Sequence, residues 1–137
     1  TDSLESLFFF CFVVSLHTPW LPETENLITE DHFRAMREGA TFINTSRGMV
    51  VDEAAMLRVL RERPNVFAVL DVLQDEAQYG TNPLGKLPNV FVTPHIAGSM
   101  GRECHRMGNL AVEECERFLR GDPPITPITR ESAKRLA

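Results

Sequence analysis

The stretch that decides the fold is TFINTSRGMVVDEAAMLRVLRERPNVFAVLDV, residues 41–72. Two β-rich runs, Thr41–Ser46 and Val66–Val72, enclose Asp52–Arg63, where apolar side chains recur at helical spacing. Asp52 is placed to cap this helix at its start. Strand, helix and strand in this order predict two parallel strands joined by a right-handed crossover.

The same alternation continues on both sides of this stretch. Val13–His17 and Val90–Thr93 predict two further strands, and Thr29–Arg37 predicts a helix with a threonine cap. Val66–Val72 and Val90–Thr93 are nearly continuously apolar, which is typical of strands covered on both faces. The apolar run Leu7–Val14 is too short to span a bilayer, so we expect a buried strand and its approach there.

The carboxyl-terminal part has a different pattern. Arg102–Arg120 predicts one long helix, which Gly121 can cap. Its apolar stripe consists of Met107, Leu110, Ala111, Cys115, Phe118 and Leu119. Leu73–Asn89 is a connection of a length that is usually functional or disordered. We therefore expect residues 1–100 to contain the sheet, and residues 101–137 to form a closing helix and a tail.

Composition excludes several classes of protein. With 137 residues, 43% of them hydrophobic, the chain can form one domain with a single core. A net charge of -5 without a basic cluster argues against a nucleic-acid partner, and no run is long enough for a membrane span. The 3 cysteines and 4 histidines lack the spacing of a disulfide framework or a metal site. We expect reduced thiols, a cytoplasmic protein and no metal.

Polar residues follow the ends of all the predicted strands. Because the carboxyl ends of parallel strands meet at one edge of a sheet, we expect a ligand site at that edge. The polar candidates at this edge are His17, Thr18, Thr45, Ser46, Arg47, Asp71, Glu76 and His95.

Some of these residue types suit particular chemistry. Arg47 can bind a carboxylate through two parallel hydrogen bonds, and Gly48 behind it allows close backbone approach. His95 can transfer a proton near neutral pH, with a carboxylate such as Glu76 holding its ring. Asp71 can accept hydrogen bonds from a ligand amide, or it can cap a turn. The alternatives are a surface ion pair for Arg47 and a structural loop histidine for His95. A Ser/His/Asp hydrolase would need a G-x-S-x-G motif, which the sequence does not contain.

Several motifs occur in the order in which one enzyme family carries them. They are VVSLHTP (13–19), INTSRG (43–48), VVDEAA (50–55), VLDV (69–72), LPNVFVTPHIAGS (87–99) and FLRGDPP (118–124). In this combination the chain resembles the D-isomer-specific 2-hydroxyacid dehydrogenase family. The resemblance implies an α/β fold with a partial Rossmann-like parallel sheet and covering helices. The first half of the nucleotide-binding domain would be lacking, since its G-x-G-x-x-G loop is absent from the sequence.

The resemblance also implies a role for each candidate residue. Arg47 would orient the substrate carboxylate and carbonyl, His95 would exchange a proton with the carbonyl oxygen, and Glu76 would pair with His95. Asp71 would contact the nicotinamide carboxamide. The residues expected to touch the cofactor, NAD or NADP, are Thr18, Thr45, Ser46, Arg47, Asp71, His95 and Ala97.

The function implied is hydride transfer between NAD(P)H and a small 2-keto or 2-hydroxy acid, such as glyoxylate, hydroxypyruvate or phosphoglycerate. The complete protein would be a homodimer. One alternative is a non-enzymatic, NAD-responsive binding protein, because the C-terminal binding protein corepressors resemble this family and retain similar residues. Another is an inactive fragment, whose first strand would expose an apolar edge and promote self-association.

Overall fold

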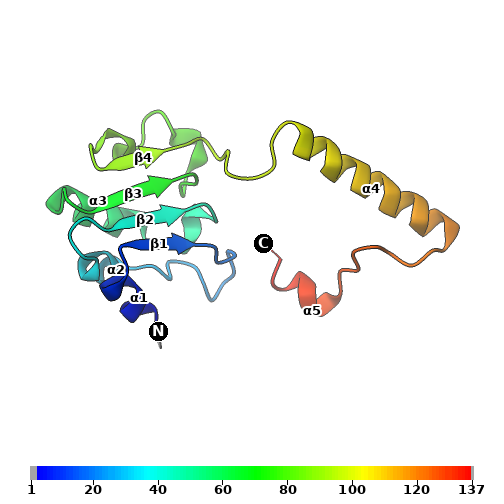
Figure 1. Cartoon of the computed structure of the whole chain (residues 1–137), viewed down its shortest axis with the longest axis horizontal. Coiled ribbons are helices and arrows are strands. Elements are labelled where there is room, and N and C mark those ends of the chain that lie inside the picture. The colour runs from blue at the N-terminus through cyan, green and yellow to red at the C-terminus, as the bar shows by residue number, and fades with distance from the viewer. Residues whose placement is uncertain (1–2, 137) are drawn as a thin grey trace. The chain divides into compact units, whose positions relative to one another are not determined.

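Four parallel strands lie side by side in one sheet, as the sequence predicts (Figure 1). The structure is a computed structural model that describes residues 3–136. The strands are β1 (Val13–Leu16), β2 (Thr41–Asn44), β3 (Phe67–Leu70) and β4 (Val90–Val92), in the spatial order β1-β2-β3-β4. All three neighbouring pairs are parallel. The α/β class and the partial Rossmann-like sheet are therefore confirmed.

The two predicted crossover helices are present with their predicted caps. They are α2 (Glu30–Ala35) and α3 (Glu53–Glu62). Thr29 and His32 form a capping box, in which the Thr29 N–H donates to His32 Nδ1 at 3.0 Å. The Asp52 carboxylate accepts a hydrogen bond from the Ala55 N–H at 2.8 Å. Helix α2 ends earlier than predicted, because Met36 already has an extended backbone.

The core lies on one face of the sheet. Phe42, Ala68 and Leu70 are buried and share one cluster with side chains from α2 and α3. The alternate positions are open, with Phe67 42% and Phe91 64% exposed. The expectation that β3 and β4 are covered on both faces is therefore wrong for the described residues. The strands obey the two-residue alternation of a sheet with one covered face.

The expectation of a buried strand approach over Leu7–Val14 is wrong in its first half. Residues Leu4–Phe10 form helix α1, and the Ser3 side chain accepts the hydrogen bond that caps it. Only Phe8 of this helix is buried; its ring lies 6.1 Å from Phe33 and 6.0 Å from Phe42. One inward aromatic side chain per turn suffices to dock a short helix, so the remaining phenylalanines stay exposed. Among residues 3–136, no helix has the length and apolar character that a membrane span needs.

The described chain divides into two compact units, one ending at His95 and one over Ile96–Leu136. The boundary drawn from the sequence lies at residue 100. The second unit contains α4 (Arg102–Arg120), which has the predicted bounds, and the short α5 (Arg130–Ala133). Gly121 ends α4 in the left-handed conformation, with φ 76°. The predicted apolar stripe is present in α4, but none of the helix's residues is buried.

Candidate active site

Main-chain hydrogen bonds join the ends of three strands at one edge of the sheet. The Asp71 N–H donates to the Asn44 carbonyl at 2.9 Å, and the His95 N–H donates to the Asp71 carbonyl at 2.9 Å. The residues that follow β2, β3 and β4 are therefore neighbours at this edge. This juxtaposition is what the parallel strand order predicts.

Asn44 shapes the turn that leads from β2 to Arg47. Its side chain is buried, and its Oδ1 accepts hydrogen bonds from both the N–H and the Oγ of Ser46, each at 2.9 Å. Its Nδ2 donates to the Arg47 carbonyl at 3.1 Å. The Arg47 guanidinium in turn donates to the Ser46 carbonyl at 2.8 Å. This Asx-type turn fixes the backbone on either side of the arginine and directs a planar cation to the sheet edge.

Gly48 is required by the close passage of another chain segment. A Cβ at this position would overlap the backbone of Leu73 and Gln74. The close backbone approach expected at Gly48 is present, and the approaching segment is the start of the connection after β3. The glycine therefore lets the arginine turn and this connection pack against each other.

The long connection Leu73–Asn89 is folded rather than irregular. It contains two short 3-10 helices, η2 (Glu76–Gln78) and η3 (Pro83–Lys86). Glu53 of α3 holds both parts of the connection: one carboxylate oxygen accepts from the Gln74 N–H and the other from Asn82 Nδ2, each at 2.8 Å. These contacts give the segment that bears Glu76 a defined position.

Glu76 and His95 form the predicted pair. The Glu76 Oε1 atom lies 2.9 Å from His95 Nδ1, and both side chains are a little under half exposed. His95 has a left-handed backbone, with φ 53°, and its N–H is shared between the carbonyls of Asp71 and Thr93. A carboxylate at Nδ1 orients the imidazole ring. The other ring nitrogen, Nε2, is then the atom that can exchange a proton with a ligand.

Asp71 is buried beneath this pair. Its Oδ1 accepts a hydrogen bond from Thr93 Oγ1, and its main-chain carbonyl accepts one from the Tyr79 hydroxyl at 2.9 Å. Burial, together with the negative charges of Glu76 and Asp71, raises the pKa of Tyr79 to about 12. Asn44, Thr93 and Tyr79 are not among the site residues expected from the sequence. An asparagine directly before a turn is a readable signal, whereas nothing in the sequence marks Tyr79.

The remaining candidates lie at several places. Thr18, Thr45 and Ser46 are partly buried just beyond β1 and β2. His17 is exposed, with its Nε2 atom 2.8 Å from Ser15 Oγ. Ala97 belongs to the second unit.

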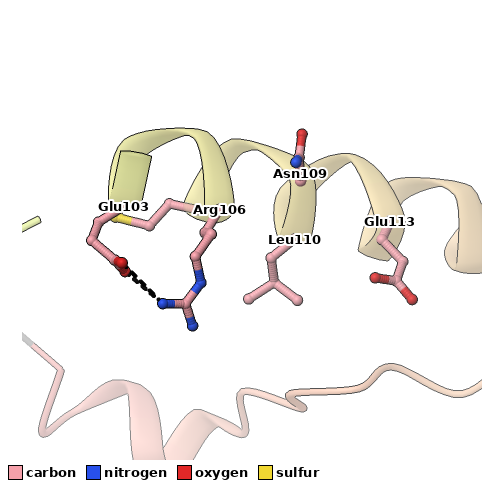
Figure 2. Close-up of a pocket in the computed structure, with 6 residues that line it drawn as sticks. Glu103, Arg106, Asn109, Leu110 and Glu113 are labelled. Carbon is pink, nitrogen blue, oxygen red and sulfur yellow. Dashed lines mark hydrogen bonds and ion pairs between the residues drawn. The ribbon is translucent and has the colours of Figure 1, made fainter. Parts of the chain in front are cut away.

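A separate hollow of about 400 Å³ runs along α4 in the second unit. It is lined by Glu103, Arg106, Met107, Asn109, Leu110 and Glu113. Figure 2 shows the Glu103–Arg106 ion pair on the same face as Leu110, with Asn109 pointing away from that face. None of the predicted site residues lines this hollow.

The fold is thus an α/β domain in which a carboxylate–imidazole pair and the residues that follow β2 and β3 lie at the carboxyl edge of the sheet. Residues 1–97 match the family model described as D-isomer specific 2-hydroxyacid dehydrogenase, NAD binding domain. The chain belongs to this family.

Individual relatives agree with this assignment. The chain is 38% identical to a glyoxylate reductase of Thermofilum pendens over 122 residues, which cover 89% of the chain and 36% of that protein. It is 34% identical to a hydroxypyruvate reductase of Blautia hydrogenotrophica over 111 residues, covering 81% of the chain and 34% of that protein. The crystal structure of D-lactate dehydrogenase with NAD+ from Lactobacillus jensenii superposes with a TM-score of 0.82 at 28% identity, over 94% of this chain and 43% of that one. The chain thus spans about a third of the length of these two relatives.

Proposed function

We propose that the complete protein transfers a hydride between NAD(P)H and a small 2-keto or 2-hydroxy acid. The observation that carries this proposal is the Glu76–His95 pair, because a held imidazole at the sheet edge is the group that such a reaction needs for its proton. Family membership supports the same reaction class. Relatives named glyoxylate reductase and hydroxypyruvate reductase suggest a substrate that is a small 2-keto acid.

In this proposal each residue of the edge has one task. Arg47 binds the substrate carboxylate and so orients the carbonyl group. His95 donates a proton to the carbonyl oxygen during reduction and takes it back during oxidation, while Glu76 keeps the imidazole ring in place. These fixed groups lower the barrier by positioning and by complementing the charge that develops on the oxygen.

The residues of the edge also suit the nicotinamide end of the cofactor, which supplies the hydride when bound. Asp71 is buried next to the main chain of His95 and offers an acceptor for a carboxamide N–H. Thr18, Thr45, Ser46 and Ala97 would contribute contacts on the cofactor side. The sequence contains no G-x-G-x-x-G motif, so binding of the pyrophosphate is not assigned to any residue of this chain.

The decisive experiment replaces the proton donor in the complete protein. We expect His95→Gln to lower kcat for keto-acid reduction by about 10²–10⁴-fold, because the acid–base group is lost. NADH affinity, measured by fluorescence titration, should stay close to that of the wild type. His105→Gln is the matched control, since His105 is an exposed residue of α4, and it should leave both quantities unchanged.

Two results would contradict the proposal. The mechanism is wrong if His95→Gln binds NADH and reduces keto acids at the wild-type rate. A complete protein that binds NAD(H), dimerises in response to it and turns over no keto acid would instead favour the non-enzymatic binding protein.

For the active enzyme we propose a homodimer in the cytoplasm, with free Cys11, Cys104 and Cys115 in keeping with a reducing compartment.

A further inference from the structure

We propose that Tyr79 is a positioning residue for the Glu76–His95 pair: its hydroxyl ties the turn that bears Glu76 to the same carbonyl that holds the backbone of His95. The effect of Tyr79 on catalysis rests on the proposed function. The physical coupling of the three residues can be tested without any activity.

Tyr79 and His95 share one hydrogen-bond acceptor. The Asp71 carbonyl accepts the Tyr79 hydroxyl at 2.9 Å and the His95 N–H at 2.9 Å. A carbonyl oxygen has two lone pairs, so it can serve both donors at once. The two hydrogen bonds therefore fix Tyr79 and His95 relative to one atom at the end of β3.

Tyr79 lies next to the turn that bears Glu76. It directly follows η2, the single turn that begins with Glu76, and its ring packs against the main hydrophobic cluster. Apart from the Glu76–His95 contact, the side-chain contacts of η2 among the described residues are local: the Asp75 side chain accepts hydrogen bonds from the Ala77 N–H and from Gln78 Nε2. The tyrosine hydroxyl is thus a tie from this turn to the strand edge.

The backbone conformation of His95 depends on its surroundings. A non-glycine residue with φ 53° lies in a sparsely populated region, and surrounding contacts must hold it there. If the hydroxyl of Tyr79 is removed, the turn is released from the edge and Glu76 can shift relative to the imidazole. The ring packing of Tyr79 is kept in a phenylalanine variant, so that variant isolates the hydroxyl.

The first test measures the hydrogen bond between Glu76 and His95 by NMR on the 137-residue chain. We expect Tyr79→Phe to increase the rate at which the His95 Nδ1 proton exchanges with water by about tenfold, the equivalent of one net hydrogen bond. Glu76→Gln, which removes the carboxylate acceptor, should increase the exchange rate at least as much. The matched control is Thr81→Val, which removes another hydroxyl of the same connection, one that donates to the Gln78 carbonyl at 3.4 Å. It should have no effect.

The second test uses the complete protein. We expect Tyr79→Phe to lower kcat by about tenfold through misplacement of the pair, with an unchanged KM for NADH. A purely structural tyrosine would lower the melting temperature without changing kcat or the proton exchange. If the wild-type complete protein reduces no keto acid, the proposed function fails, yet the exchange measurement still decides the coupling.

A third measurement does not depend on the folding of Tyr79→Phe. The chain contains 1 tyrosine, Tyr79, so the phenolate absorbance measures the ionisation of this side chain alone. Burial contributes most to the raised pKa of Tyr79, and the charges of Glu76 and Asp71 raise it further, so Glu76→Gln should lower this pKa part of the way toward its ordinary value. The positioning role is overturned if Glu76→Gln leaves the pKa of Tyr79 unchanged, or if Tyr79→Phe folds and its His95 proton exchanges at the wild-type rate.

Discussion

At the scale of single residues, the site depends on hydrogen bonds that join main chain to side chain. Asn44 places Arg47, Asp71 places His95, and the Tyr79 hydroxyl shares the acceptor that holds His95. Each of these contacts uses a backbone carbonyl, that of Arg47 in the turn after β2 or that of Asp71 directly after β3. The side chains of the site therefore take their precision from the strand ends.

The raised pKa of Tyr79 gives a prediction about stability at high pH. The pKa is about 12 in the folded chain against an ordinary value of 10.0, so the unfolded chain loses its proton first as the pH rises. The stabilising contribution is complete below pH 10.0 and is lost as the pH approaches about 12. We expect the free energy of unfolding of the wild type to fall over this window more steeply than that of Tyr79→Phe. Denaturant titrations of both proteins at several pH values measure the difference, and parallel curves would contradict it.

At the scale of elements, two segments that are remote in sequence are packed backbone to backbone. The turn at Gly48 follows β2, and Leu73–Gln74 begins the connection after β3. Glu53 then holds this connection through Gln74 and Asn82. The positions of Arg47 and Glu76 are consequently linked through one contact between loops.

This contact predicts contrasting effects of two glycine substitutions. Gly48→Ala should destabilise the chain by about 3 kcal/mol, because a Cβ would force the backbone of Leu73 and Gln74 apart. Gly80→Ala is the matched control: nothing lies within 4 Å of its added Cβ, and we expect a change within about 0.5 kcal/mol. Urea unfolding followed by circular dichroism measures both. Equal stability of Gly48→Ala and the wild type would show that the close approach is not rigid.

At the scale of the whole molecule, burial is unevenly distributed between the two units. The first unit contains all the buried core residues, from Phe8 to Leu84. In the described part of the second unit no side chain is buried, and Met107, Leu110, Phe118 and Leu119 are exposed on α4. Regions with few buried apolar contacts open at low free energy.

The uneven burial predicts different amide protection for the two longest helices. In hydrogen exchange of the 137-residue chain at low concentration, amides of α4 should exchange at least about tenfold faster than those of α3, whose apolar face is buried. Helix α3 is the internal control. Equal protection at every concentration would contradict the prediction, whereas protection of α4 that rises with concentration would indicate self-association through its apolar residues.

Periodicity and caps determined the secondary structure from sequence alone. The four strands follow from their apolar patterns, although their hydrogen bonds join distant residues. The caps at Thr29 and Asp52 and the bounds of α4 follow from local rules, because hydrogen bonding within a few residues decides them. The prediction failed for Leu7–Val14, where a run of phenylalanines suits a strand or a helix equally well. Only packing of Phe8 against Phe33 and Phe42 selects the helix.

The sequence by itself also determined which strand-end residues share an edge, because parallel strands must present their carboxyl ends on the same side. The roles assigned to Arg47, Glu76 and His95 stay predictions until the variants are measured. Only the tertiary structure decided that the connection after β3 folds back to bring Glu76 within 2.9 Å of His95, and that Tyr79 shares their support. The physical reason is that both contacts depend on the path of this connection. The first joins side chains that are 19 residues apart, and the second uses a backbone carbonyl, which every residue has and which the sequence therefore does not distinguish.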